Sequence, residues 1–184
     1  MARSCAFTGH RPQKFPWRFN EDDPRCAALK AVLAEQIAAL TKLGVTGFFS
    51  GMALAVDTWA AQSVLALREE YPQIKLHCVL PCRDQDAKWS AAAKETYRTI
   101  LAQADSIQCV SQHYYNGCML ARNRQLVELA SVVLAVYDGK LTGGTAATIR
   151  YAQEQKKEII CIEPISLRVT HEKPFGGCVD IALF

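Results

Sequence analysis

Long apolar runs are missing from this sequence, and none approaches the roughly 20 residues with which a helix crosses a bilayer. The segment from Met1 to Cys5 has no signal-peptide character, so we expect a cytoplasmic protein without a membrane partner. In that reducing compartment the eight cysteines are expected to be free thiols, not a disulfide framework. Most of them, including Cys5, Cys78, Cys109 and Cys161, sit in apolar runs and are expected to pack as small buried groups.

The chain has little net charge: its 21 basic and 18 acidic residues leave only +3. An excess this small does not indicate a nucleic-acid partner, although a local basic patch would be hidden in the total. Hydrophobic residues make up 50% of the chain and charged residues 21%, which argues against disorder. Without an internal repeat or a linker, residues 1–184 are expected to form a single domain.

Metal-ligand pairs at a suitable spacing are absent as well. His77, Cys78 and Cys82 come nearest to a zinc site, but His77 and Cys78 are adjacent in a predicted strand and point to opposite faces. No second ligand pair follows, so we expect no metal. Glycine motifs of the G-x-G-x-x-G or Walker A type are missing too, which leaves less specific loops to be searched for a ligand site.

Short apolar runs alternate with helical patterns along the chain. The six predicted strands cover residues 4–8, 46–50, 75–80, 106–110, 132–137 and 158–162. The five predicted helices begin near Pro24, Val56, Trp89, Asn116 and Gly143. Several strands are nearly continuous apolar runs, as expected when helices cover both faces. The pattern predicts an α/β, Rossmann-like three-layer fold, with a mostly parallel sheet of about six strands and helices on both faces.

Two segments do not follow this alternation. Residues 12–24 form a long loop that could be a lid over a site or a surface loop pinned by Trp17 and Phe19. Residues 165–184 form a C-terminal extension that is too apolar for a free tail. We expect this extension to form a short edge strand or to pack on a partner subunit, which would make the protein a homodimer.

Ligands of such sheets bind at the carboxyl ends of strands, so the loops that follow strands are the candidate sites. The first loop is Thr8-Gly9-His10-Arg11-Pro12. Gly9 would let backbone N–H groups approach a ligand, and the Arg11 guanidinium suits a phosphate. His10 could donate a hydrogen bond or act as an acid or base. The alternative is a tight turn with a solvated arginine and a capping histidine, and position alone does not decide between them.

The second loop, Ser50-Gly51-Met52-Ala53, joins the second strand to the second helix. A strand, a glycine and a helix N-terminus can bind an anion through free N–H groups and the helix dipole. Asp57 follows within the first two helical turns, where it could bind a ribose hydroxyl or serve as a general acid or base. It could instead do no more than favour the helix N-terminus through the dipole.

The third loop follows the fifth strand and places Gly143, Gly144 and Thr145 at a helix start. This arrangement repeats the anion-binding geometry with hydroxyl groups added, and Thr148 lies three residues after Thr145, so both can line one face. A flexible turn with a threonine cap is the alternative. Because the arrangement recurs after two strands, we favour a ligand site.

Together these loops resemble one family. The segments that carry the resemblance are Cys5 to Pro12, Ser50 to Ala53 with Asp57 and Trp59, Ala135 to Gly139, and Gly143 to Thr145. They look like the YpsA-type, DUF1273 proteins of the SLOG superfamily, which includes the LOG cytokinin-activating enzymes and DprA. The resemblance spans about residues 4–164. It implies a Rossmann-like domain that binds nucleotide-derived ligands, with no assigned reaction for this branch.

The fourth predicted helix carries Arg122-Asn123-Arg124. Its two arginines diverge by about 200°, so only one is expected to reach a given site. Arg122 matches the arginine of an Arg-Lys pair in the LOG enzymes, and Asn123 replaces the lysine. The resemblance therefore adds Arg122 and Asn123 to the candidate ligand-binding residues.

The LOG enzymes also carry a catalytic glutamate after their glycine loop, and this chain has none at the matching place. Thr148 or Arg150 stands there, depending on the alignment. An oxocarbenium-like transition state needs a nearby carboxylate, so this departure argues against N-glycosidic hydrolysis unless Asp57 supplies one.

Three functions are consistent with these features. The first is a sensor or binding protein for a phosphate-bearing, nucleotide-like small molecule, such as a nucleotide, ADP-ribose or an NAD-related compound. The second is an enzyme that cleaves nucleoside monophosphates, with Asp57 or His10 as the acid–base group and Arg11 or Arg122 on the phosphate. The third is a DprA-like binder of single-stranded DNA, which would need a basic groove with exposed aromatics. We favour the first, because the loops suit a phosphate while no acid–base pair stands out.

Overall fold

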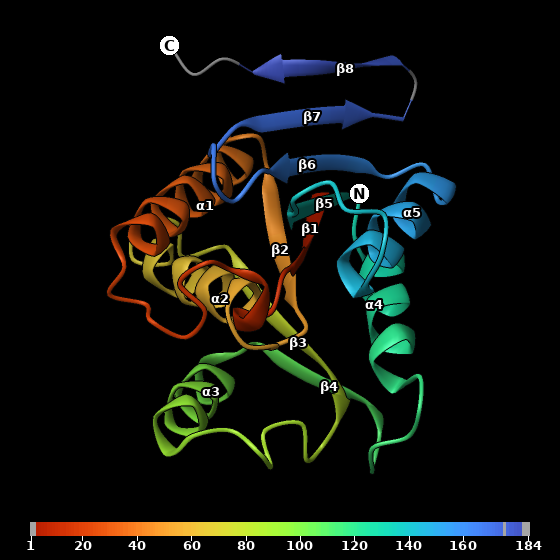
Figure 1. Ribbon diagram of the computed structural model, residues 1–184. Coiled ribbons are helices and arrows are strands. Elements are labelled where there is room, and N and C mark those ends of the chain that lie inside the picture. The colour runs from red at the N-terminus through yellow and green to blue at the C-terminus, as the bar shows by residue number, and fades with distance from the viewer. Residues whose placement is uncertain (1–2, 175, 182–184) are drawn as a thin grey trace.

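The computed structural model describes residues 3–174 and 176–181, with side chains up to residue 174, and it confirms the α/β, Rossmann-like architecture. Figure 1 shows a central sheet between two layers of helices. The strands within these ranges are β1 Arg3–Gly9, β2 Val45–Ser50, β3 Lys75–Cys82, β4 Ser106–Ser111, β5 Val132–Val136, β6 Glu158–Ile162, β7 Val169–Lys173 and β8 Gly176–Ile181. The helices are α1 Pro24–Lys42, α2 Val56–Leu67, α3 Ala91–Gln103, α4 Cys118–Leu129 and α5 Gly144–Glu154, with a short 3-10 turn at Pro12–Lys14.

The strands form one sheet in the order β4-β3-β2-β1-β5-β6-β7-β8. Neighbours from β4 across to β6 are parallel, whereas β7 and β8 pair antiparallel at one edge. The chain builds β1 to β4 outward in one direction and then returns to place β5 on the other side of β1. The strand order therefore reverses between β1 and β5, which is the place where sheets of this kind bind ligands.

The register of β1 and β5 brings two of the predicted loops together. Thr8 pairs with Ala135, and Gly9 pairs with Val136, at the last residues of the two strands. Because the strands are parallel and end level with each other, the loops that follow them leave the sheet side by side. This pairing sets the first and third predicted loops on either side of one crevice.

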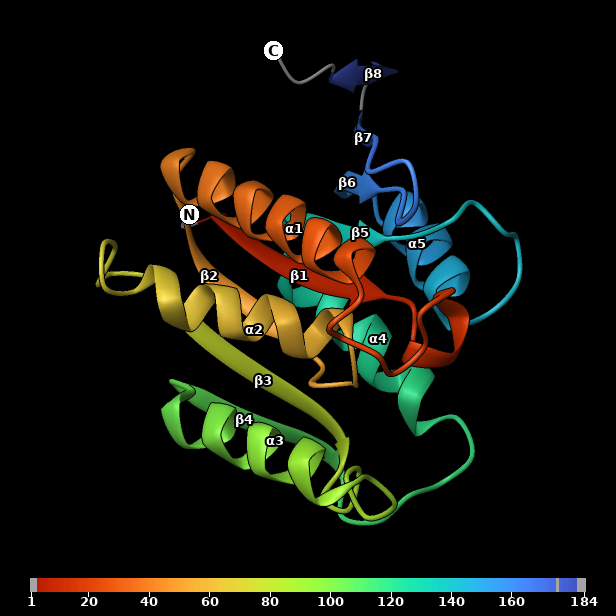
Figure 2. The same cartoon turned by 60° about the vertical axis from the view of Figure 1, so that its left-hand side comes forward.

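The helices divide between the two faces of the sheet, as Figures 1 and 2 show: α1, α2 and α3 cover one face, and α4 and α5 cover the other. The first helix follows its sequence signals closely. Asp23 caps it by accepting a hydrogen bond from the Arg25 amide at 2.9 Å, and Pro24 is its first residue. Its predicted apolar stripe, Leu29, Leu33, Ile37 and Leu40, is buried in the main core between α1, α2 and the sheet. Within the described ranges, every helix is too short or too polar to cross a bilayer.

The C-terminal extension makes the sheet wider than the six strands that the sequence predicted. Its residues 169–173 pair with β6, and residues 176–181 pair with β7, so the edge-strand alternative holds for both segments. Val169 is buried against the core and anchors β7 there. The sequence pattern missed these two strands because both are short and β7 is half polar. Phe184 lies outside the described residues, so packing of the extension on a partner subunit stays a prediction.

The loop at residues 12–24 is held down by aromatic rings, although not by the predicted pair. Trp17 is buried and stacks on the buried Phe15, with 4.9 Å between ring centroids. Phe19, expected to share that role, is 62% exposed. Farther along, Glu21 accepts a hydrogen bond from the Trp59 indole at 3.0 Å, and Trp59 is a core residue as predicted. These contacts fit the surface-loop interpretation, with Phe15 in place of Phe19.

The outer strand β4 departs from the expectation that the cysteines pack as buried groups. Five of the seven cysteines with described side chains are buried free thiols: Cys5, Cys26, Cys78, Cys82 and Cys118. Cys109 is exposed, because β4 has a neighbour on one side only and most of its side chains remain uncovered. Cys161 on β6 is partly buried. An apolar run therefore did not distinguish an edge strand from a central one.

Gly9 lies where α2 packs against the end of β1. A Cβ atom added there would come within 2.6–2.7 Å of three side-chain atoms of Val56, the first residue of α2. Steric clashes of this kind force backbone shifts in a packed interior. The glycine is thus required by the contact between helix and strand, a role that the sequence analysis did not assign to it.

We predict that Gly9→Ala lowers the free energy of unfolding by about 1–3 kcal/mol, because the added methyl group overpacks the contact with Val56. Urea denaturation of the two proteins measures the difference. Gly47→Ala on β2 is the matched control, since a Cβ atom there meets nothing closer than 3.7 Å. Equal stability of the Gly9 and Gly47 variants would contradict this account of the contact.

Candidate functional site

A cavity of about 260 Å³ opens at the crevice between β1 and β5. Four segments surround it: the end of β1 with its following loop, the start of α2, the first half of α4, and the loop from β5 into α5. The lining residues are Thr8, Gly9, His10, Arg11, Lys14, Ala53, Asp57, Met119, Arg122, Asn123, Asp138, Lys140, Thr142, Gly143, Gly144 and Thr145. The structure thus brings ten of the fourteen predicted site residues to one cavity. Ser50, Gly51, Met52 and Thr148 are not part of its lining.

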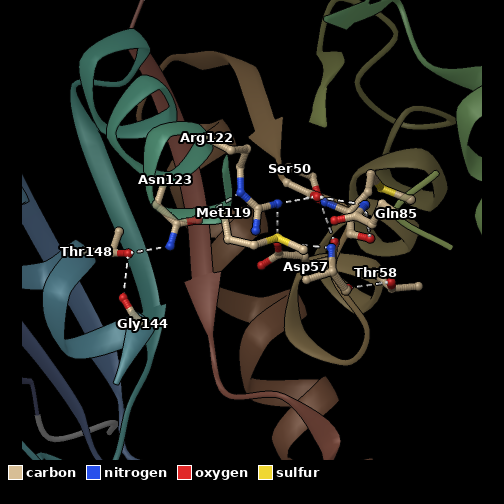
Figure 3. Close-up of polar contacts among 12 residues, drawn as sticks. Ser50, Asp57, Thr58, Gln85, Met119, Arg122, Asn123, Gly144 and Thr148 are labelled. Atoms are coloured by element: carbon tan, nitrogen blue, oxygen red, sulfur yellow. Dashed lines mark hydrogen bonds and ion pairs between the residues drawn. The ribbon is translucent and has the colours of Figure 1, made fainter. Parts of the chain in front are cut away.

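A buried ion pair forms the floor of this site. Nη1 of Arg122 lies 3.6 Å from Oδ2 of Asp57, and both side chains are more than 90% buried. The same Nη1 donates a hydrogen bond to the Gly51 carbonyl, and Nε donates to Oδ1 of Asn123 at 2.8 Å. Figure 3 shows the guanidinium held between Asp57 and Asn123. Burial raises the pKa of the Asp57 carboxyl, and the nearby charges of Arg122 and Arg11 oppose that rise.

Gly51 is the residue that lets Arg122 reach this position. A Cβ atom on Gly51 would lie 1.7 Å from Nη1 of Arg122, closer than any two such atoms can approach. The glycine therefore makes room for a side chain rather than for a ligand. On the same helix Arg124 points elsewhere, with its guanidinium carbon 5.6 Å from the centre of the Tyr151 ring. The expectation that only one of the two arginines reaches the site holds.

The second predicted loop uses its own amide donors internally. The Met52 amide donates to Oγ of Ser50 at 3.1 Å, and the Ala53 amide donates to Oδ2 of Asp57 at 3.2 Å. The Ser50 hydroxyl in turn donates to the Asp57 carbonyl at 2.9 Å. Ser50, Gly51 and Met52 are buried behind the cavity wall. The anion position that this loop suggested is therefore already taken by the Asp57 carboxylate.

The third predicted loop ends in an open helix N-terminus. Gly143 has a φ of 101°, which favours glycine, and no side chain caps the first turn of α5. The amides at the start of a helix have no partner within the helix, so those of Gly144 and Thr145 remain available at the cavity. The helix dipole favours an anion at this end.

Thr148 lies one turn into α5 and holds the N-terminus of this helix in place through two hydrogen bonds. Its hydroxyl donates to the Gly144 carbonyl at 2.8 Å and accepts a hydrogen bond from Nδ2 of Asn123 at 3.0 Å. Because Asn123 also accepts from Arg122, a chain of side-chain hydrogen bonds joins α4 to the first turn of α5 (Figure 3). Thr148 thus contacts the site residues and not the cavity itself.

His10 and Asp138 face each other across the crevice. Nε2 of His10 lies 3.0 Å from Oδ1 of Asp138 and 3.3 Å from its backbone amide nitrogen. Nζ of Lys140 lies 3.1 Å from the other carboxylate oxygen. Burial alone would raise the pKa of Asp138, but hydrogen bonds from Lys140 and His10 outweigh it and hold that pKa below its usual value. Asp138 and Lys140 were not among the predicted site residues, although both belong to the third predicted loop.

Positive charge predominates in the lining. Lys14 and Met119 also line the cavity without having been predicted, and each lies three residues or fewer from a predicted site segment. Among the described residues, Nη2 of Arg11 has only the Met119 thioether as a hydrogen-bond partner, at 3.9 Å, and a thioether is a weak acceptor. The lining therefore contains four basic side chains and two carboxylates, an excess of two positive charges. The basic residues are Arg11, Lys14, Arg122 and Lys140, and the acidic ones are Asp57 and Asp138. Such a lining suits an anionic ligand.

The residues considered for zinc lie away from this cavity. Nδ1 of His77 is 2.8 Å from the Ser106 hydroxyl, between β3 and β4. Burial raises the pKa of the Cys78 thiol to about 12 and that of Cys82 to about 11, which disfavours the thiolate that a metal requires. In the part of the chain that the structure describes, no group of three His, Cys, Asp or Glu residues is arranged to hold a metal ion.

Comparison with known proteins agrees with the resemblance that the loops indicated. The model of the YpsA SLOG family matches residues 5–167. A UPF0398 protein of Bacillus pumilus is 31% identical over 175 residues, which cover 92% of this chain and 94% of that protein. A UPF0398 protein of Brevibacillus brevis is 32% identical over 127 residues, or 68% of each chain. A third, from Halalkalibacterium halodurans, is 29% identical over 160 residues, covering 83% of this chain and 85% of its own.

The raised pKa of Asp57 predicts how stability depends on pH. The Asp57 carboxyl holds its proton more tightly in the native state than in the unfolded chain. The stabilisation that it contributes to the folded state is therefore complete below about pH 4 and is lost as pH rises through the native pKa. We expect wild-type protein to lose stability relative to Asp57→Asn as pH rises from about 4 to 7. Urea denaturation across that range measures the difference.

The control for this experiment is Asp22→Asn, which removes an exposed carboxyl group outside the cavity. Its free energy of unfolding should run parallel to that of the wild type between the same pH values. If the wild type instead gained stability relative to Asp57→Asn as pH rises, the two arginines would outweigh burial and the assigned direction would be wrong.

Proposed function

The chain belongs to the YpsA SLOG family, and we propose that its cavity binds a phosphate-bearing, nucleotide-derived small molecule, such as a nucleotide, ADP-ribose or an NAD-related compound. One observation carries the proposal. The open N-terminus of α5 and the guanidinium groups of Arg11 and Arg122 meet at a single cavity, at the point where the strand order reverses. Backbone amides, a helix dipole and arginine side chains are the groups that proteins use for phosphate.

The phosphate would lie at the first turn of α5. There the amides of Gly144 and Thr145 can donate hydrogen bonds, and Arg11 can replace its weak thioether contact with a charged oxygen. Arg122 is held by Gly51 and Asn123, so it would act from the floor as a fixed positive charge. The arrangement is largely formed in advance, which reduces the entropy that binding must overcome.

The site favours a protein that binds this ligand without catalysing a reaction. Asp57 is the carboxylate on the floor of the cavity, and it is engaged with Arg122 and with the Ala53 amide. We also propose that the protein is a single domain and that it acts in the cytoplasm, which buried free thiols such as Cys5, Cys26 and Cys78 support. A homodimer and the lack of a nucleic-acid partner remain predictions from the sequence.

Hydrolysis of nucleoside monophosphates is the second candidate, because one observation favours it. Asp57 lines the cavity with a raised pKa, and a carboxyl that keeps its proton closer to neutral pH can act as a general acid. His10 is a second candidate group, and it contacts Asp138 across the same cavity. The two candidates differ in whether a bound nucleotide is consumed.

We predict that AMP, ADP-ribose or NAD raises the melting temperature of the protein at ligand concentrations near 1 mM, because a ligand that binds only the native state stabilises it. Phosphate-free adenosine should have no effect. Arg11→Gln should weaken binding about 10- to 100-fold, the loss expected for a hydrogen bond to a charged group. Calorimetric titration measures this loss.

The matched control for Arg11→Gln is Arg98→Gln, which removes an exposed arginine of α3 outside the cavity. Its affinity should equal that of the wild type. Failure of all three phosphate-bearing ligands to stabilise the protein would count against the proposed function. If both arginine variants lost the same affinity for the ligand, the loss would not depend on the cavity.

The two candidate functions are separated by incubating the protein with AMP and following free adenine by chromatography. As a binding protein it should leave AMP intact over many hours at a concentration that saturates the site. Release of adenine by the wild type, abolished in Asp57→Asn, would favour the enzyme instead, because only an acid–base role requires a carboxyl that ionises. Release that persists in Asp57→Asn would assign the reaction to another group.

A further inference from the structure

Among the described residues, the imidazole of His10 is the one aromatic ring in the cavity lining, which holds no phenylalanine, tyrosine or tryptophan. Its only apolar side chains are those of Ala53 and Met119, and the remaining positions are polar, charged or glycine. Sites for base-bearing ligands are lined mainly by apolar and aromatic groups, and bases stack on aromatic rings. The cavity therefore lacks the large aromatic platform that Phe, Tyr or Trp would supply, and His10 is already engaged with Asp138 and with two neighbouring rings.

The aromatic rings closest to the site are already engaged with other residues. Phe15 and Tyr137 pack edge-on against His10, with ring centroids 6.1 Å and 6.0 Å away. Phe15 also stacks on Trp17, and the Tyr137 hydroxyl donates to the Lys140 carbonyl. These rings hold His10 in place from behind and do not line the cavity.

The lining instead offers hydrogen-bonding groups without partners. Thr8 is 7% exposed and Thr145 is 9% exposed, and no hydrogen bond among the described residues uses either hydroxyl. Oδ1 of Asp57 and Nη2 of Arg122 likewise have no partner there, since their contacts all run through other atoms. The residues that carry these four groups line the cavity, so the groups are open to a ligand with several hydroxyl groups.

The size of the cavity agrees with a ligand of this kind. Its volume of about 260 Å³ falls below the 300–1,000 Å³ that pockets for drug-sized molecules commonly enclose. A sugar with one phosphate presents hydroxyl groups that both donate and accept, together with an anion for the helix N-terminus. Threonine hydroxyls and a carboxylate oxygen are suitable partners for those hydroxyl groups.

We propose that the cavity recognises the sugar–phosphate portion of its ligand, and that the base contributes little to affinity. The substrate class is thus phosphorylated sugars, either free or as part of a nucleotide. This inference rests on the proposed function, because it assigns the phosphate to the α5 N-terminus as before. It adds that Thr8, Thr145 and Asp57 bind the sugar hydroxyls, a division of roles that makes the base dispensable.

Calorimetric titration with ribose 5-phosphate, AMP, adenosine and inorganic phosphate tests this inference. Ribose 5-phosphate should bind within about fivefold of AMP, a difference of about 1 kcal/mol. Adenosine should bind at least about 100-fold more weakly than AMP, and inorganic phosphate at least about tenfold more weakly than ribose 5-phosphate. AMP binding more than about tenfold tighter than ribose 5-phosphate would overturn the inference, because the base would then supply affinity.

Two further outcomes separate this inference from the proposed function. If AMP binds, and inorganic phosphate binds with the same affinity as ribose 5-phosphate, the cavity recognises only the phosphate. The sugar inference then fails while the proposed function stands. If neither AMP, ADP-ribose nor NAD binds, the proposed function itself fails, and the inference fails with it.

A variant series locates the sugar contact. Thr8→Val removes one hydroxyl at nearly constant shape and should weaken ribose 5-phosphate and AMP by the same factor, about fivefold, the value of one neutral hydrogen bond. Thr8→Ser keeps the hydroxyl and should restore both affinities, whereas a fault in folding would affect phosphate binding too. Thr99→Val on α3 is the matched control outside the cavity. Unchanged affinity of Thr8→Val for ribose 5-phosphate would remove Thr8 from the sugar site and overturn the assignment.

Discussion

The buried contact between Arg122 and Asp57 is the constraint on which the candidate site depends. Taking two charged groups out of water is costly, and their attraction compensates only when further hydrogen bonds satisfy them. Here the Gly51 carbonyl and Asn123 accept from the guanidinium, while the Ala53 amide donates to the carboxylate. The pair thereby ties the end of β2, the start of α2 and the middle of α4 together, beneath one crevice.

This constraint explains why two helix starts with similar sequences have different roles. At α2 the amide of Ala53 is satisfied by Asp57, and the chain takes positive φ values at Met52 and Ala55 that few residues other than glycine adopt. At α5 no carboxylate follows the glycines, so the first-turn amides stay open to the cavity. The chain thus fills one potential anion site with its own side chain and leaves the other for a ligand.

The glycines show the same division between packing and binding. Gly9 and Gly51 were attributed to ligand approach, yet a Cβ atom at either would collide with Val56 or Arg122. Only Gly143 combines a positive φ with a position on the cavity. A glycine after a strand therefore indicates a close approach, but the neighbour that approaches is decided by residues far away in the chain.

Local signals in the sequence determined the alternation of strands and helices, the cap at Asp23 and the loops that would border a site, because these depend on periodicity and on neighbouring residues. They could not determine β7 and β8, which are short strands stabilised by pairing with β6 and with each other. Nor could they show that Asp57 would engage Arg122, 65 positions away, or that Lys14, Met119 and Lys140 would line the cavity. Those outcomes were decided by the tertiary structure, since they arise only when the sheet order brings β1 beside β5 and buries two opposite charges between distant helices.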